Sequence, residues 1–246
     1  FILISFMDLS NHLSLPFAYL LQDFNLEQLT NLRDINDYSL LHCAVLNNNT
    51  AKVIELVHSN FPLDLLTVNS EINFELIKKF IPFEFSKSMN IVFSNEGYTP
   101  LHLNLFLLNY YMSFKPDKKE FTIQKFKAEQ EKILNIFLEN DQECLSLLDS
   151  RGFSLFDYAF LFENTFLINK FFDIDSTFKY LHFVKPSTAL DILKIIQIKE
   201  NKKTIKNLYH EPINSQIFNN LQKKLLNDKL TMDLNTKNSV KSVNKI

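Results

Sequence analysis

The sequence predicts an all-α fold, built as a stack of small helix-turn-helix units. Two observations carry this prediction. A short segment with the features of a turn followed by a helix cap occurs three times, at residues 37–44, 97–102 and 152–159. Each copy is followed by an apolar run with helical spacing, a polar turn and a second apolar run. Helices that are apolar on several sides are buried between neighbours, as they are when repeated units stack.

The middle copy reads Gly-Tyr-Thr-Pro-Leu-His, and its residues suit the start of a helix. Gly97 permits a left-handed turn. Thr99 can act as the N-cap by accepting a backbone hydrogen bond, and Pro100 then falls at the first helical position, where its missing N–H is no loss. His102 is close enough to reach back toward Thr99, as an acid does in a capping box.

The other two copies keep the same order with substitutions. In the first copy Ser39 is the cap, Asp37 stands in place of the glycine, and His42 keeps the histidine position. Asp is tolerable there because it can adopt the left-handed region. In the third copy Gly152 and Ser154 keep the glycine and the cap, and an aspartate replaces the histidine. The three segments therefore predict three equivalent helix starts.

This pattern resembles the signature of the ankyrin repeat, a unit of about 33 residues that consists of a β-turn and two antiparallel helices. The resemblance implies an α-solenoid of stacked ankyrin-like repeats over residues 33–230, with a half-repeat or helical cap at residues 1–32. It also implies a non-catalytic role in protein–protein interaction, because stacks of this family usually bind other proteins.

The spacing departs from the regular step of that family. The copies start 60 and 55 residues apart, so we expect insertions at about residues 60–93 and 113–127. The first of these is either a degenerate repeat or a true insertion. A fourth signature is expected near residues 187–191, with Thr188 as its cap, followed by a closing helix. Residues 231–246 contain few apolar side chains and are expected to form a disordered tail.

Composition narrows the setting of the protein. The net charge of −2 gives no general attraction to nucleic acid or to an anionic membrane, and no apolar run approaches the roughly 20 residues that a membrane span needs. Two cysteines are too few for a disulfide framework, which favours an intracellular and cytoplasmic location, in a host cell if the chain is an effector. The chain opens on Phe1, so we expect either a fragment or a translation start at Met7.

Catalytic patterns are missing from the sequence. Two glycines in the whole chain exclude a phosphate-binding loop and a dinucleotide fingerprint, and there is no nucleophile elbow and no zinc-binding H-E-x-x-H. His42 and His102 are expected to act in helix capping, and Cys43 and Cys144 to pack in the core. The sequence therefore predicts no catalytic, cofactor-binding or metal-binding residue, and no enzyme.

The ankyrin resemblance implies that a protein partner binds the turn tips and the exposed part of the inner helices. The candidate contact residues are Asn36, Asp37, Tyr38, Asn95, Glu96, Tyr98, Arg151 and Phe153. They include an aromatic residue after each turn glycine or aspartate, and aromatic side chains and Arg are enriched at interfaces. The alternative is that these rings pack sideways against neighbouring turns.

The expected function is thus that of a scaffold or inhibitor which binds a protein partner. One alternative is a substrate-recognition fragment of a larger enzyme, or of a bacterial or viral effector. Another is nucleic-acid binding through residues 113–127, where lysines alternate with phenylalanines. The overall charge disfavours that last function, and the same residues also fit a solvated helix extension.

Overall fold

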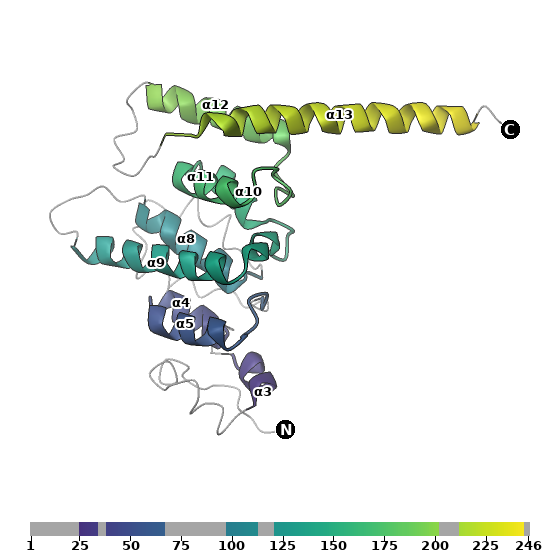
Figure 1. Ribbon diagram of the computed structural model, residues 1–246. Helices are drawn as coiled ribbons and strands as arrows, with labels where there is room; N and C mark the ends of the chain where they lie inside the picture. The colour runs from purple at the N-terminus through teal and green to yellow at the C-terminus, as the bar shows by residue number, and fades with distance from the viewer. Residues whose placement is uncertain (1–24, 34–37, 67–96, 113–120, 202–211, 244–246) are drawn as a thin grey trace. The chain divides into compact units, whose positions relative to one another are not determined.

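The structure is a computed structural model, and it describes residues 25–33, 38–66, 97–112, 121–201 and 212–243 (Figure 1). Within these residues the regular structure is helical, apart from one isolated antiparallel bridge between Leu148 and Ser154. The predicted all-α class is confirmed for this part of the chain. The chain divides into two compact units, Phe1–Leu155 and Phe156–Ile246, and each is considered by itself.

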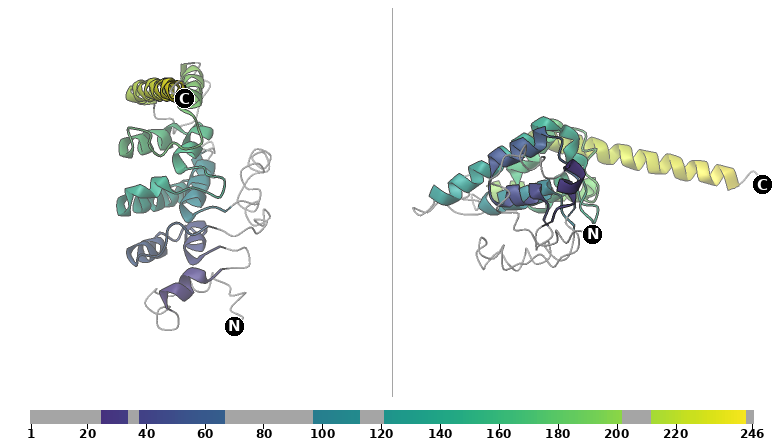
Figure 2. Two further views of the ribbon diagram at one scale, coloured as in Figure 1. Left: turned by 90° about the vertical axis from the view of Figure 1, so that its right-hand side faces the viewer. Right: turned by 90° about the horizontal axis from the view of Figure 1, so that it is seen from below.

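The described helices of the first unit are α3 (Leu26–Asn31), α4 (Leu40–Leu46), α5 (Thr50–His58), α8 (Pro100–Met112) and α9 (Phe121–Asn140), followed by the 3-10 turn η1 (Gln142–Ser146). Helices α4 and α5 form a hairpin, and α8 and α9 lie side by side as a second pair (Figures 1 and 2). Because α4 packs on α8 and α5 packs on α9, the two pairs form two layers of this unit.

Among the described helices of the first unit, α8 is the most completely buried. Every residue from Pro100 to Met112 is buried except Asn109. A helix that is apolar on all sides is stable only when neighbours cover every face, and α4 and α9 both pack against this one. Helix α5 instead buries a stripe that includes Val53, Leu56 and Val57.

A buried polar side chain connects the two layers. On α9, the Nε2 of Gln130 donates to the backbone oxygen of Val45 and to the Oδ1 of Asn48, both at 2.8 Å. The side-chain nitrogen of Asn104, on α8, donates to the Oε1 of Gln130 at 2.6 Å and to its backbone oxygen at 3.0 Å. The amide groups of these two side chains therefore tie the end of α4 to α8 and α9.

The second unit contains most of α10 (Leu155–Leu161), together with α11 (Thr165–Ile174), α12 (Pro186–Asn201) and α13 (Ser215–Val243). Its core contains a cluster of aromatic rings. The ring of Phe156 lies 5.6 Å from that of Phe160, 5.9 Å from that of Phe171 and 5.4 Å from that of Phe178, centroid to centroid. Helix α12 packs on the first part of α13, and α13 continues beyond it (Figure 1).

The turns that join α4 to α5 and α10 to α11 have the same geometry. Asn48 and Glu163 stand at equivalent positions with φ of 52° and 51°. In both turns three successive N–H groups donate to carbonyl oxygens four, three and five residues back. The next residues, Asn49 and Asn164, are the N-caps of α5 and α11. Two separate stretches of sequence therefore fold into the same local unit.

The predicted fourth signature differs from the structure. Helix α12 begins at Pro186, so Thr188 lies inside the first helical turn and is not the N-cap. Proline is favoured at the first helical position, and here it places the helix start three residues earlier than an N-cap at Thr188 requires. Asp191 is exposed and pairs with Lys194 at 2.9 Å, so it does not take the buried position of an inner-helix signature residue.

Parts of the expected insertion and of the expected disordered tail are helical where they are described, and for the insertion this agrees with the alternative of a helix extension. Residues 121–127, from the expected insertion, are the first turns of α9, where Phe126 lies against Tyr111 and the buried Lys127 pairs with Glu131 at 3.2 Å. Residues 231–243, from the expected disordered tail, continue α13. This stretch contains neither Pro nor Gly, so a helix already nucleated at Ser215 can propagate through it. None of the described helices is long and apolar enough to cross a membrane.

We expect the substitution Gln130→Leu to lower the free energy of unfolding by about 2–3 kcal/mol, because the carbonyl of Val45 and the amide of Asn104 lose a buried partner. Urea denaturation followed by circular dichroism measures the change. Lys132→Gln, at an exposed site on the same helix, is the control and should shift stability by less than about 0.5 kcal/mol. Equal effects of the two variants would show that the buried amide does not connect the layers.

Candidate functional site

The recurring segments form a series of connected turns, and we call residues 38–42, 97–102 and 149–154 the linked turns. In the first of them Ser39 is the N-cap of α4, and its Oγ accepts from the N–H of His42 at 3.4 Å. The Nδ1 of His42 accepts from the N–H of Ser39 at 3.3 Å and lies 2.7 Å from its Oγ. His42 thus completes the capping box of α4, in the same role that Gln28 has in the capping box of α3.

The other ring nitrogen of His42 reaches the next turn. Its Nε2 lies 2.8 Å from the backbone oxygen of Tyr98. A carbonyl oxygen only accepts hydrogen bonds, so Nε2 carries the proton and Nδ1 is the acceptor. One buried imidazole therefore closes the start of its own helix and also holds a turn that is 56 residues away in the sequence.

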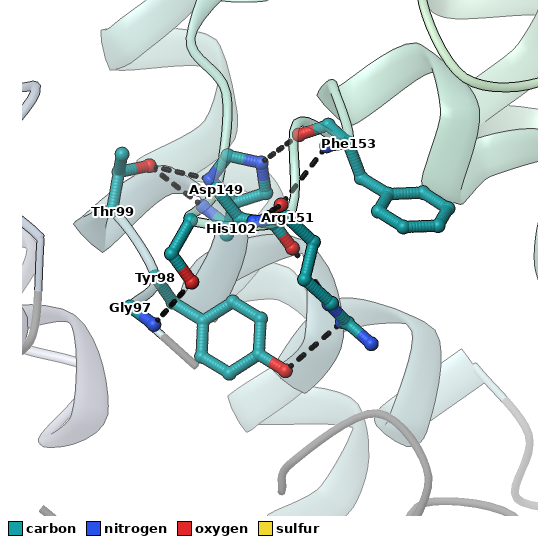
Figure 3. A network of polar contacts seen from close by, with 8 residues as sticks. Gly97, Tyr98, Thr99, His102, Asp149, Arg151 and Phe153 are labelled. Carbon is teal, nitrogen blue, oxygen red and sulfur yellow. Dashed lines mark hydrogen bonds and ion pairs between the residues drawn. The ribbon is translucent and has the colours of Figure 1, made fainter. Parts of the chain in front are cut away.

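His102 repeats the arrangement in the second turn (Figure 3). Its backbone N–H donates to the Oγ1 of Thr99 at 3.3 Å, and its Nδ1 lies 2.8 Å from the same oxygen. Its Nε2 donates to the backbone oxygen of Phe153 at 3.1 Å. Pro100 is the first residue of α8. We call the side chain at this third helical position, here His42 and His102, the return side chain.

The third turn is shaped by Asp149 and Gly152. The Oδ1 of the buried Asp149 accepts from the N–H groups of Arg151 and Phe153, each at 2.9 Å. The backbone N–H of Asp149 donates to the oxygen of Phe153 at 3.0 Å, and that of Gly152 donates to the oxygen of Asp149 at 2.9 Å. Gly152 has φ of +86°, a conformation that favours glycine. Ser154 is buried directly before α10.

Further contacts join the second and third turns (Figure 3). The N–H of Gly97 donates to the Oγ of Ser150 at 2.9 Å, and the N–H of Ser150 donates to the oxygen of Gly97 at 3.0 Å. The guanidinium group of Arg151 donates to the hydroxyl of Tyr98 at 3.3 Å and stacks over the ring of Phe153 at 5.1 Å. The two turns therefore form one connected polar layer.

In the second unit Asp157 stands at the position of the return side chain. Its carboxylate accepts from the backbone N–H groups of His182, Phe183 and Val184, at distances between 2.8 and 3.3 Å. A carboxylate accepts where the imidazole donates, so the segment that it holds presents N–H groups and not carbonyl groups. The substitution of His by Asp in the third signature thus goes with the opposite direction of hydrogen bonding.

Burial sets the charge states of His42 and Cys144 in the first unit. It lowers the pKa of His42 from 6.5 to about 3; the hydrogen bond with the Tyr98 carbonyl acts in the opposite direction, and Coulombic repulsion from Arg33 and His102 lowers the value further. Burial and then the negative charge of Asp141 raise the pKa of Cys144 to about 12. His42 is therefore neutral and Cys144 a protonated thiol at neutral pH. Cys43 is also buried.

The predicted partner-contact residues divide into three groups. Tyr38 and Tyr98 are only 5% and 2% exposed, and their rings tilt against those of His42 and His102. Solvent-facing contact does not describe these two tyrosines, because both are buried and each ring lies against the histidine of its own helix start. Arg151 and Phe153 are half-buried. Asn36, Asp37, Asn95 and Glu96 lie outside the described residues.

Three residues that shape these sites are missing from the sequence-based prediction. Asp149 has a local signal, since Asp followed by Ser, Arg and Gly is typical of a turn. Ser150 and Phe183 have no local signal, because their contacts come from residues distant in the sequence. Among the residues that the structure describes, no group of three or more His, Cys, Asp or Glu side chains could hold a metal ion.

Comparisons with protein-family models, with curated proteins and with solved structures find no significant match to this chain.

We expect His102→Gln to cost about 1 kcal/mol of stability and His102→Ala about 2 kcal/mol. Glutamine can keep the capping box, as Gln28 does in α3, but leaves the link to the Phe153 oxygen unmade, while alanine loses both contacts. Chemical denaturation of the two variants beside the parent measures the difference. If His102→Gln is as stable as the parent, the link between the turns contributes nothing.

The pKa of His42 predicts a loss of stability in acid. Its folded pKa lies below the unfolded value, so the stabilising contribution is complete above pH 6.5 and is lost as the pH falls toward 3. The slope is about 1.4 kcal/mol per pH unit, which gives a loss of about 2 kcal/mol at pH 5. The stability difference between the parent and His42→Gln should shrink by this amount between pH 7.5 and pH 5. A constant difference would mean that His42 titrates normally in the folded protein.

Proposed function

We propose that this chain is a non-catalytic scaffold, built from ankyrin-like repeats, that binds a protein partner at the solvent-facing side of the linked turns. The observation that carries the proposal is the polar layer in which return side chains fix successive turns. Such a layer keeps a protein surface in one conformation, so little conformational entropy is lost when a partner binds.

The repeated local geometry supports the ankyrin-like architecture. In the first unit two helix pairs stack with first helix on first helix and second on second. The turns after α4 and α10 share their hydrogen-bond pattern and their left-handed residue. Three signature segments place a side chain at the third helical position that binds a later segment of chain. Repetition of this kind is what stacked repeat proteins require.

The state of the reactive side chains supports a non-catalytic role. Both ring nitrogens of His42 and of His102 contact groups within the turns, so neither imidazole is placed to exchange a proton with a substrate. The thiol of Cys144 is buried and stays protonated, and a protonated thiol is a poor nucleophile. These side chains stabilise the fold. The surface beside them is then the part of the linked turns that can bind a partner.

Arg151 and Phe153 are the two residues of this surface that we propose to contact the partner. The guanidinium group of Arg151 is oriented by the carboxylate of Asp149 at 3.5 Å and by the hydroxyl of Tyr98. The backbone of Phe153 is fixed by His102 and Asp149. Arg and aromatic residues dominate binding hot spots, and a side chain that is already oriented loses less entropy on contact. Tyr38 and Tyr98 act as supports of this surface.

Site-specific photo-crosslinking tests the proposal. A photoreactive phenylalanine analogue at position 153 should form an adduct with one defined protein in cell extract. The same analogue at position 139, an exposed site on α9 of the same unit, is the matched control and should form none. The yield at position 153 should fall when Arg151→Ala is added. Equal adducts from both positions, or none from either, would contradict binding at the linked turns.

A further inference from the structure

We propose that residues 175–185, the Phe183 loop, form a second docking site, which binds an acidic peptide segment of a partner protein with Phe183 as the apolar anchor. The loop belongs to the second unit and shares no residue with the linked turns. A test of this site is therefore independent of a test of the proposed surface at Arg151 and Phe153.

One end of the loop is held by a buried carboxylate. Asp157, on α10, is fully buried and accepts hydrogen bonds from three successive backbone N–H groups of the loop. The shortest, from Val184, is 2.8 Å, and the N–H of Phe183 lies within 3.1 Å of both carboxylate oxygens. Hydrogen bonds to an ionised acceptor are the stronger kind. The backbone of Phe183 is therefore fixed before any partner arrives.

The other end of the loop is held in a similar way. The buried carboxylate of Asp175 accepts from the N–H and the hydroxyl of Thr177, at 3.1 and 2.7 Å, and from the N–H of Tyr180 at 3.0 Å. Phe178 is completely buried with φ of 56°, and its backbone oxygen accepts from the ammonium group of Lys224 on α13. A bulky residue holds this backbone conformation only where its surroundings enforce it.

Phe183 projects outward from this fixed backbone. Its side chain is 58% exposed, whereas Tyr180, Leu181 and Val184 are buried. Its place in the hydrogen-bond pattern is that of Phe153, because a return side chain binds the backbone of both residues. Phe153 is half-buried beneath Arg151, so Phe183 presents more of its ring. An exposed aromatic ring on a rigid backbone has the properties of an interface anchor.

The charge around Phe183 identifies the chemistry of the partner. Lys179 and Lys185 are exposed in the same loop, and the ammonium group of Lys179 lies 4.3 Å from the centre of the Tyr180 ring, which orients it. The acidic residues of the site, Asp157 and Asp175, are buried and bind backbone N–H groups. The exposed charged residues of the loop are therefore both lysines, and their charge complements an acidic segment.

A peptide fits these residues better than a nucleic acid does. Single-stranded nucleic acids bind along grooves where several bases stack on aromatic rings and several phosphates meet cations. The Phe183 loop offers one exposed phenylalanine ring, with the exposed His182 beside it, between two lysines. A peptide with one apolar side chain between acidic residues matches that arrangement.

Selection of short random peptides by the 246-residue chain tests the proposal. The selected peptides should carry a negative net charge and at least one large apolar residue. Phe183→Ser should weaken their binding about tenfold or more. Leu226→Ser, which removes a side chain of similar exposure (61%) on α13, is the matched control and should leave binding unchanged. Circular dichroism should show that both variants keep the helical content of the parent.

Charge reversal supplies the second arm of the test. The double variant Lys179→Glu and Lys185→Glu should lose the acidic peptides that the parent selects. Several outcomes would overturn the site: no enriched peptide, enrichment without an acidic excess, or equal binding by Phe183→Ser. Tight binding of a fluorescent single-stranded DNA probe that depends on Phe183 would also overturn it, in favour of nucleic-acid recognition.

Discussion

The hydrogen bond from a return side chain to the next segment of chain is the interaction on which the rest of the structure depends. Apolar burial drives helices together, but it is non-directional and fixes no register. The imidazoles of His42 and His102 supply the direction, because each closes its own helix start and binds one particular carbonyl group. In the second unit the carboxylate of Asp157 binds backbone N–H groups of a later segment. These groups are buried, so an unmade hydrogen bond at any of them would be costly, and the correct arrangement of turns is strongly favoured.

This dependence explains which parts of the fold are readable from sequence. The starts of α4 and α8 follow from residues within one helical turn, namely a cap, a return side chain and, in α8, the favourable Pro100. The all-α class follows from the helical spacing of the apolar runs. At α12 the same cap pattern predicts Thr188 as the N-cap, although Pro186 is the first residue of the helix. The expectation of a disordered tail rests on composition, and composition does not report that a helix begun upstream can propagate through residues 231–243.

The candidate site is less readable than the fold, because its decisive contacts are long-range. Ser150 forms a hydrogen bond with Gly97, which lies 53 positions away in the sequence. No local sequence pattern predicts this contact. Tyr38 and Tyr98 have the sequence context of exposed turn residues, yet both are buried, with their rings against His42 and His102. The two proposed contact surfaces share one origin. In each, a return side chain fixes the backbone of a phenylalanine, Phe153 or Phe183, whose ring faces outward to a different degree.

The carboxylate of Asp157, in place of an imidazole, also restricts which segment of chain can follow it. A segment that follows a histidine must offer a carbonyl oxygen, and one that follows the aspartate must offer N–H groups. If the segment after Asp157 were replaced by one from the first unit, a carboxylate would face a carbonyl, and two acceptors would repel each other without a proton between them. If a helix start with a histidine return side chain is duplicated next to another of the same type, each imidazole N–H still faces a carbonyl oxygen. Recombination across Asp157 does not keep donors opposite acceptors, so the order of these helix starts along the gene is itself a structural requirement.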